Sequence, residues 1–479
     1  MKSITVRNYR CFGNEPQKVD LAPLTLFVGE NSSGKTSLMA LMRALWDAAV
    51  DSRVPDFKEE PYDLGGFSEI VHRSETQESQ SDSFEGRFEI EDPIHVSPDK
   101  KIPPVECGVI FGERWSVPVP ISRRYRCGEL WVTQYLSDDE SDRIEIGTQR
   151  GYWKLNSKKK RIAAISGGYT KSMMDIGDFL LNVSVLLKKD QERSGVEIEF
   201  IGDSKDSSDK DLTELIESLG VNLRNLFNLY RMLDFLVARS FQGDGRRPFA
   251  TAPVRSQPQR IYDLRRSSSD ALGDYVPTYL AQLSQRDEQT WIILKERLES
   301  FGRSAGLFDE IRVRRLGQTD VDPFKVEVRK CDTGAEGSFR NLVDVGYGVS
   351  QVLPVALELL REDGPPKLLL QQPEVHLHPS AQAALGTLLC EVAVSDAPSY
   401  GRQLVVETHS DYIIDRVRMA VADPGQRIGP DDVSIVYFER GDAEVFLHSL
   451  TIDELGNVLD APPGYRNFFL DELQRSVGF

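Results

Sequence analysis

The sequence predicts an α/β fold in which a parallel sheet is covered by helices and a long region is inserted between its two halves. The first observation is a block of strand and helix patterns at residues 1–48, and the second is a similar alternation from about residue 340 to residue 440. Such alternation is typical of parallel strands joined by helices. The third observation is a glycine-rich loop at residues 29–36, between a predicted strand and a predicted helix.

This loop has the sequence G-E-N-S-S-G-K-T, which matches the phosphate-binding pattern G-x-x-x-x-G-K-[ST]. The apolar run before it, at residues 24–28, predicts a buried strand, and residues 37–45 predict a helix. Glycines let successive N–H groups point at phosphates, and the helix N-terminus adds a positive dipole. We expect Lys35 to reach the β- and γ-phosphates and the Thr36 hydroxyl to bind Mg²⁺. Both flanks argue against the alternative, a chance Gly-Ser turn. The expected nucleotide-contacting residues here are Gly29, Asn31, Ser32, Ser33, Gly34, Lys35, Thr36 and Ser37.

Composition places the chain among ordinary soluble globular proteins. Of its 479 residues, 40% are apolar and 28% are charged, and no run of about 18 apolar residues predicts a membrane span. The N-terminus enters a strand pattern without the apolar core of a signal peptide. The five cysteines are scattered and include no C-x-x-C pair, which argues against a disulfide framework and a zinc site. We therefore expect a cytoplasmic protein.

The net charge of −17 argues against a surface that binds nucleic acid everywhere, but it leaves room for a local basic groove. Arginines crowd the stretch from residue 246 to residue 266, and residues 158–161 form a second basic run, which we interpret as a solvated surface. The arginines of the first stretch are Arg246, Arg247, Arg255, Arg260, Arg265 and Arg266.

The middle of the chain predicts an insertion of two kinds. Residues 84–155 are rich in β-branched and aromatic residues broken by proline and glycine, which indicates an antiparallel subdomain. Residues 170–300 have a mainly helical pattern without a sustained heptad repeat. The expected organisation is an N-terminal half of the α/β domain at residues 1–75, a β-rich insertion at 76–165, a mainly helical insertion at 166–335 and a C-terminal half at 336–479.

A second helix N-terminus is expected after the sequence D-V-G-Y-G-V-S-Q, in a helix at residues 346–360. Its two glycines permit a tight turn, Ser350 is a suitable N-cap, and Pro354 is expected in the first turn. A helix N-terminus with a hydroxyl beside it suits a phosphate. An ordinary capped helix is the alternative.

Two apolar strands then end in polar residues, where a parallel sheet places its ligand crevice. The strand at residues 367–370 leads into Q-Q-P-E-V-H-L-H-P, and the strand at residues 403–407 leads to His409 in T-H-S. A neutral imidazole at that place can contact a γ-phosphate or polarise a water. The remaining predicted elements are helices at residues 379–394 and 411–421 and a strand at residues 433–438.

In this order, the motifs resemble the head of ABC-type ATPases, in the branch that holds RecF, the SMC proteins and the overcoming-lysogenisation-defect (OLD) nucleases. The resemblance covers residues 1–48 and about 340–479 well. Residues 8–12 (N-Y-R-C-F) are similar to the N-terminal strand motif of the branch, residues 346–351 to its signature loop, and residues 408–410 to its switch-histidine motif. The resemblance therefore implies an ABC-type P-loop ATPase head with a long inserted region.

Residues 253–262 and the tail at residues 463–469 are similar to stand-alone bacterial members of this family. Many of those are ATPase subunits of anti-phage systems such as PARIS and Septu. The resemblance implies that two chains close on two ATP molecules with Mg²⁺. The phosphate loop would act in cis, Gly348 and Ser350 would act in trans, and His409 would be the switch histidine.

The chain departs from the family at the end of the strand at residues 367–370. The family has an acid for Mg²⁺ there, followed by a glutamate that orients the attacking water, whereas this chain has Gln371 and Gln372. Glutamine offers Mg²⁺ only a carbonyl oxygen and does not accept a proton from water. Glu374 is the nearest carboxylate, and it either replaces the lost base or sits in the turn. We therefore predict that ATP binds well and is hydrolysed slowly. The candidate catalytic residues are Gln372, Glu374 and His409, and the candidate Mg²⁺ ligands are Thr36 and Gln371.

His376 and His378 suggest a metal site, but no third ligand is evident in the sequence. The same H-L-H-P run is common in the resembled family after this strand. We therefore do not expect a metal ion there.

Two functions are compatible with these patterns. The first is an ATPase subunit that oligomerises through its heads and controls a separate effector, a nuclease of an anti-phage defence system. OLD nucleases have a Toprim domain after the head, and roughly forty residues follow Arg440 here, too few for such a domain. The chain itself is therefore not expected to cleave DNA. The alternative is a RecF-like DNA-repair ATPase whose head clamps duplex DNA. A P-loop kinase of small molecules fits poorly, because the signature and switch motifs have no role in it.

Overall fold

The computed structural model describes most of the chain in twelve stretches, with three sheets among them. The described residues are 1–49, 54–73, 82–90, 104–136, 143–148, 151–157, 196–202, 247–263, 270–319, 322–330, 337–395 and 402–465. The basic run at residues 158–161, most of the expected helical region from 170 to 246, Arg265, Arg266 and the end of the tail lie outside these stretches.

The central sheet has the strand order β11-β15-β16-β3-β17-β18-β19, and it is parallel from β11 to β17. Its parallel strands are apolar runs, as expected for strands that are covered on both faces. The strands are β11 (Phe249–Thr251), β15 (Lys367–Gln371), β16 (Gln403–Glu407), β3 (Leu24–Gly29), β17 (Val433–Arg440), β18 (Val445–Ile452) and β19 (Val458–Leu459).

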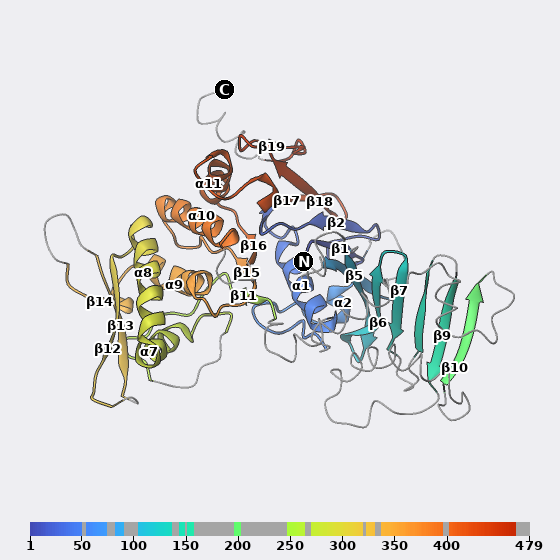
Figure 1. Cartoon of the computed structure of the whole chain (residues 1–479), viewed down its shortest axis with the longest axis horizontal. Helices are drawn as coiled ribbons and strands as arrows, with labels where there is room; N and C mark the ends of the chain where they lie inside the picture. The colour runs from blue at the N-terminus through green and yellow to red at the C-terminus, as the bar shows by residue number, and fades with distance from the viewer. Residues whose placement is uncertain are drawn as a thin grey trace, which may run out of the picture.

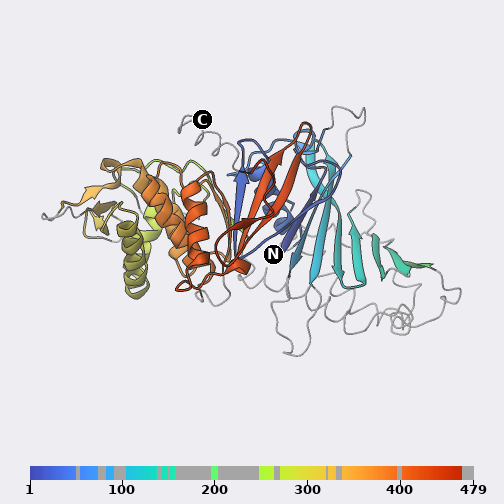
Figure 2. The ribbon, with the colours of Figure 1, turned by 90° about the horizontal axis from the view of Figure 1, so that it is seen from above.

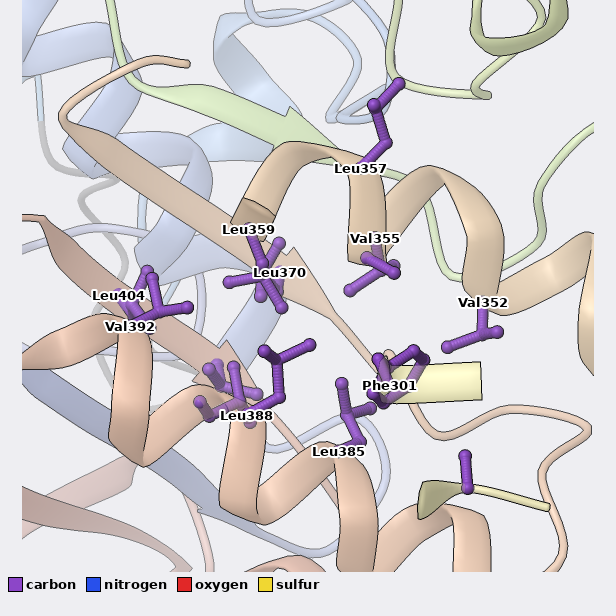
Figure 3. Close-up of a cluster of buried hydrophobic side chains, with 14 of the residues drawn as sticks. Phe301, Val352, Val355, Leu357, Leu359, Leu370, Leu385, Leu388, Val392 and Leu404 are labelled. Carbon is purple, nitrogen blue, oxygen red and sulfur yellow. The ribbon is translucent and has the colours of Figure 1, made fainter. Parts of the chain in front are cut away.

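Helices cover both faces of this sheet. This is possible because successive residues of each strand point to opposite faces, and apolar side chains occupy both. Leu370 and Leu404 pack with α9, α10 and α11 on one face, whereas Leu369 and Val405 pack with α1 on the other. Figure 3 shows the first of these clusters, with Leu370 of β15 lying among side chains of α9 and α10. The helices are α1 (Lys35–Ala49), α9 (Tyr347–Leu360), α10 (Pro379–Ala393) and α11 (Asp411–Ala422).

A nine-stranded antiparallel sheet, with the order β10-β9-β8-β7-β6-β5-β4-β1-β2, packs on α1 and extends away from the central sheet (Figures 1 and 2). The two N-terminal strands belong to it rather than to the central sheet. The short helix α2 (Phe67–Ile70) lies beside it. Its strands are β1 (Ser3–Arg7), β2 (Gln17–Asp20), β4 (Phe84–Ile90), β5 (Val105–Arg114), β6 (Val117–Cys127), β7 (Leu130–Tyr135), β8 (Arg143–Thr148), β9 (Gly151–Ser157) and β10 (Val196–Gly202).

At the opposite end of the molecule, a three-stranded sheet packs with two helices beside α9 (Figure 1). The elements are α7 (Val276–Arg286), α8 (Glu288–Ser304), β12 (Glu310–Arg315), β13 (Phe324–Arg329) and β14 (Arg340–Asn341), and the short helix η1 (Leu342–Asp344) leads from β14 to α9. The range from 166 to 335, expected to be mainly helical, thus also contains strands. In β12, Ile311 and Val313 alternate with arginines, which is a period-two pattern.

The predicted α/β fold is confirmed, and the strands and helices expected between residues 340 and 440 occur with nearly the same bounds. Two predictions for α9, the position of its N-cap and that of its proline, were wrong. Gly346 is its N-cap, so Ser350 lies inside the helix, and Pro354 lies beyond the first turn. Because proline has no N–H, the helix lacks the bond from Pro354 to the carbonyl of Ser350. Among the described residues, no helix is both long and apolar enough to cross a membrane.

The C-terminal end of α9 contains a buried carboxylate, Glu358, whose side chain is 1% exposed. The Nε and Nη2 groups of Arg361 donate to its Oε2 at 3.0 and 2.8 Å, and the Tyr275 hydroxyl contacts its Oε1. Arg402 donates to the backbone carbonyls of Glu358 and Leu359 at 2.7 and 2.6 Å. Burial raises the pKa of Glu358 to about 7, although the two arginines oppose this shift.

This shift predicts a pH dependence of stability. Because the folded pKa exceeds the unfolded value of about 4.3, the contribution of Glu358 is lost as the pH rises through the folded pKa. We expect the free energy of unfolding, relative to that of Glu358→Gln, to fall by about 2 kcal/mol between pH 5.5 and pH 8. Urea unfolding of both proteins at the two pH values measures this change. Glu362→Gln, at a half-exposed carboxylate, is the control, and a difference that does not vary with pH would contradict the assignment.

Candidate nucleotide-binding site

The loop between β3 and α1 has a backbone that requires its glycines. Gly29 and Gly34 have φ values of +145° and +90°, and Ser32 is also left-handed at +62°. A Cβ atom on Gly34 would lie 2.3 Å from the Sγ of Cys11, and one on Gly29 would lie 2.7 Å from the carbonyl oxygen of Phe438. The loop therefore closes tightly against the N-terminal motif on one side and the end of β17 on the other.

Lys35 lies inside the curve of this loop and is 3% exposed. Its Nζ donates to the carbonyl oxygens of Gly29 at 3.1 Å and Glu30 at 2.6 Å. Burial lowers the pKa of Lys35, and the carboxylates of Glu407, Glu30 and Glu374 oppose that shift. The loop thus surrounds one cation, which is itself surrounded by acids.

Thr36 makes a side-chain contact that the sequence did not indicate. Its Oγ1 donates to the Oε2 of Glu407 at 2.8 Å. Glu407 is the last residue of β16, the strand next to β3, and it is 4% exposed. Burial raises the pKa of Glu407, opposed by the Thr36 hydroxyl, Lys35 and Gln372. The only sequence signal for this residue was an acid at the end of an apolar strand, directly before the histidine motif.

The end of β15 is held by a buried arginine. Gln371 is 3% exposed, and Gln372 has a φ of +39° and donates its N–H to the carbonyl of Glu407 at 2.9 Å. The Nη2 of Arg255 donates to the carbonyls of Gln371 at 3.0 Å and Gln372 at 3.3 Å. Arg255 is 2% exposed, and burial lowers its pKa to about 10. Arg255 therefore fixes the backbone at the two glutamines.

Glu374 lies in the turn after β15, and its side chain is buried. Its Oε1 accepts the backbone N–H of His409 at 2.8 Å, and its Oε2 is buried without a hydrogen-bond partner in the described part of the chain. Burial raises the pKa of Glu374, opposed by that N–H and by Thr408. His409 is exposed, and its pKa is lowered first by partial burial of the ring and then by Lys35. The fold therefore brings Glu374 and His409 together beside the charges of the loop.

The start of α9 contacts the loop that follows β15. A Cβ atom on Gly348 would lie 3.1 Å from the carbonyl oxygen of His376, and the exposed ring of Tyr347 lies 6.0 Å from the ring of His376. Ser350 is 8% exposed, and its hydroxyl donates to the carbonyl of Tyr347 at 3.0 Å. Within this chain, the Ser350 hydroxyl is thus engaged by its own helix.

The described arginines of the 246–266 stretch do not form an open basic groove. Arg247 pairs with Asp47 and Glu59, with an Nε–Oδ1 distance of 2.6 Å and an Nη1–Oε1 distance of 2.7 Å. Arg260 pairs with Asp344 at 2.7 Å, and Arg255 is buried. Arg246, Arg265 and Arg266 lie outside the described residues.

The H-L-H-P run has a structural role in α10. His378 is the N-cap of that helix, and its ring nitrogen accepts the N–H of Ser380 at 3.4 Å. Within the described stretches, no group of three or more histidine, cysteine, aspartate or glutamate side chains could hold a metal ion.

Comparisons with known proteins found two ATPase-related families and several solved structures that the chain resembles. Residues 1–233 match the family described as "AAA ATPase domain", and residues 250–415 match the one described as "AAA domain, putative AbiEii toxin, Type IV TA system". Among solved structures, the chain is similar to the Smc head domain of Pyrococcus furiosus bound to the C-terminal domain of ScpA, with a TM-score of 0.42, 10% identity and 99% of each chain covered. It is also similar to the SMC head domain from Thermotoga maritima, with a TM-score of 0.35, 10% identity, and 93% of this chain and 97% of that one covered. A comparison with curated proteins gave no significant match.

Proposed function

The protein is a P-loop ATPase that carries AAA-family domains, and we propose that it binds ATP with Mg²⁺, hydrolyses it slowly, pairs with a second copy of itself and controls a separate effector. One observation carries this proposal. The phosphate loop has both Lys35 and Thr36 in place, whereas the strand end at Gln371 and Gln372 offers amides where acids are usual. Groups that bind a nucleotide are thus present, and the usual base is not.

The residues of the loop fit a triphosphate. Loops of this pattern turn N–H groups toward a phosphate at a helix N-terminus. Here the glycines have positive φ, the loop leads into α1, and the buried ammonium of Lys35 contacts the loop carbonyls. Gly29, Asn31, Ser32, Ser33, Gly34 and Ser37 would line the phosphates, Lys35 would bind their charge, and the Thr36 hydroxyl would hold Mg²⁺. When bound, Mg²⁺ supplies positive charge that stabilises the transferring phosphoryl group.

Hydrolysis depends on which side chain takes a proton from water. The amide of Gln372 does not, so Glu374 is the proposed base, because its Oε2 is buried without a hydrogen-bond partner among the described residues. Its other oxygen is engaged by the backbone of His409, which fixes the carboxylate to the switch-histidine segment. His409 is neutral near pH 7 because its pKa is lowered, so its ring can both donate and accept a hydrogen bond at the γ-phosphate.

Head-to-head pairing is proposed through the start of α9. Gly348 and the exposed Tyr347 lie at that helix terminus, and its N–H groups suit the phosphate of a nucleotide held by the other chain. Ser350 would act in trans only after its hydroxyl leaves the carbonyl of Tyr347. A shift from 1:99 to 99:1 in favour of the closed pair requires about 5.5 kcal/mol of differential binding, which two triphosphates held by charge-assisted contacts can supply.

Control of a separate effector, a nuclease of a defence system, is the function that slow hydrolysis suits best. A nucleotide that stays bound for a long time holds its protein in one conformation, which is the property of a switch rather than of a motor. The test is to purify the tagged chain from its host and to identify the products of neighbouring genes that copurify with it. Mg²⁺-dependent DNA cleavage by the pure chain would contradict a purely regulatory role.

The rate itself is a prediction. We expect the purified protein to bind ATP and to turn it over more slowly than about 10 s⁻¹, the ordinary enzyme median, because the neutral Gln372 stands at the usual base position. Phosphate release under saturating ATP and Mg²⁺ measures the rate, and light scattering with and without ATP measures pairing. Turnover well above that rate would refute the slow-switch proposal, and an unchanged mass with ATP would refute pairing.

A further inference from the structure

The end of β15 poses a problem for a bound cation. Mg²⁺ prefers carboxylate oxygens, and P-loop ATPases hold it with the loop hydroxyl and an acid at the end of a nearby strand. In this chain the two residues at that strand end, Gln371 and Gln372, are amides. Two neutral side chains leave the charge of the cation without an acid from this strand.

An acid lies at the same level of the sheet, one strand closer to the phosphate loop. In the parallel ladder between β15 and β16, Gln371 is the direct partner of Glu407. β16 lies between β15 and β3, and the next ladder pairs Glu407 with Phe27 of β3. Moving the acid from position 371 to position 407 therefore shifts it sideways by one strand and brings it beside the loop.

The contact of Glu407 supports this placement. Its Oε2 accepts the hydroxyl of Thr36 at 2.8 Å, and that hydroxyl is the group which the loop motif directs at the cation. Glu407 is 4% exposed, and a carboxylate so deeply buried needs partners. Its contact with Thr36 therefore places a carboxylate beside the hydroxyl that would hold the cation.

The amide at position 371 is part of the same arrangement. Like charges directly opposite each other in a sheet destabilise it, and two carboxylates that share a buried site cannot both ionise easily. An acid at position 371 would face Glu407 across the ladder. With glutamine there, no second carboxylate faces Glu407 from position 371.

We infer that Glu407 supplies the carboxylate that holds the nucleotide-bound Mg²⁺, in place of the acid missing at Gln371, and that it does so together with Thr36. This inference rests on the proposed binding of ATP. It assigns to the strand next to the phosphate loop the task that the family gives to the strand beyond it.

The test measures the affinity for a fluorescent ATP analogue in Mg²⁺ and in EDTA. We expect Mg²⁺ to tighten binding by the wild-type protein, and Glu407→Gln to remove about 10- to 100-fold of that gain while its affinity in EDTA stays the same. The double variant Gln371→Glu with Glu407→Gln returns the acid to β15, and we expect it to recover the gain. Mn²⁺ in place of Mg²⁺ gives a second readout, because the loss of free Mn²⁺ signal in electron paramagnetic resonance counts the ions bound with nucleotide.

A matched control is available on the other neighbour of β3. Glu439 lies near the end of β17, and its Oε2 is 2.7 Å from the Nε2 of His448, so Glu439→Gln also removes one acid from the edge of the sheet. We expect it to leave the Mg²⁺-dependent gain unchanged. Circular dichroism and thermal unfolding establish that each variant is folded.

The outcomes separate the two proposals. If the wild-type protein binds no nucleotide in either condition, the proposed function fails. If it binds and Glu407→Gln keeps the full Mg²⁺ gain, the assignment of Glu407 is overturned while ATP binding stands. If the affinity of the folded variant falls equally with EDTA, Glu407 only supports the Thr36 segment, and the assignment is again overturned. Should the single variant not fold, the double variant decides, because it has the net charge of the wild-type protein.

Discussion

Replacing Gln372 by glutamate is expected to raise the rate of ATP hydrolysis by about 10²- to 10⁴-fold, the usual contribution of a general base. The backbone at this position is fixed on both sides, because its N–H donates to Glu407 and its carbonyl accepts from Arg255. Only the end of the side chain therefore changes, from an amide to a carboxylate. Phosphate release by the purified variant, under saturating ATP and Mg²⁺, measures the gain.

The control for this gain is Gln372→Ala, which removes the side chain without adding a base, and its rate should stay close to that of the wild-type protein. The new carboxylate would lie near Glu407 and Glu374, and like charges raise the pKa of each other. The gain should therefore be larger at pH 8 than at pH 6. Glu374→Gln should abolish the slow turnover of the wild-type protein, and an unchanged rate in Gln372→Glu would contradict the loss of a base at position 372.

The helices and strands of the C-terminal half could be predicted from the sequence because each has a local pattern that indicates where it begins and ends. The apolar run of β15 ends in two glutamines and a proline, and that of β16 ends in a glutamate before the histidine motif. Such signals are local. The membership of β1 and β2 in the antiparallel sheet was not predictable, because their pairing with β4 joins segments about 80 residues apart without a local signal.

In the candidate site too, residues within one local motif could be predicted, whereas long-range contacts could not. Lys35 and Thr36 were predicted because one contiguous motif contains both residues. The bond from Thr36 to Glu407 spans 371 residues, and the bond from Arg255 to Gln371 spans 116. No spacing rule connects such pairs, so the sequence indicates neither the contact of Glu407 nor that of Arg255.

The N-cap of α9 was mispredicted because several residues in this segment are suitable N-caps. Glycine and serine are both acceptable at an N-cap, and the sequence offers Gly346, Gly348 and Ser350 within five residues. The extended backbone of Gly346, with φ of −60° and ψ of 149°, makes it the cap. That choice depends on how η1 leads the chain into the helix, which is a tertiary effect.

Replacing Lys35 by methionine is expected to weaken the binding of ATP by at least about 30-fold, since loss of one partner from a buried charge pair costs about 2–5 kcal/mol. Methionine keeps the apolar stem and removes only the ammonium, so the effect isolates the charge. Burial lowers the pKa of Lys35, which means that burial disfavours the charged form of this side chain in the folded protein. Thermal unfolding of the variant checks that it remains folded.

The matched control is Lys58→Met, which removes an ammonium from an exposed position. It should leave the affinity for a fluorescent ATP analogue unchanged. Lys35 also neutralises part of the charge of Glu407 and Glu374, so its loss leaves two buried acids without their cation. In EDTA, the anionic nucleotide then meets uncompensated negative charge, and the affinity should fall further than in Mg²⁺. If the affinity falls equally in EDTA and in Mg²⁺, Lys35 does not offset the charge of the two acids. Its role in binding would then be a direct contact with the phosphates alone.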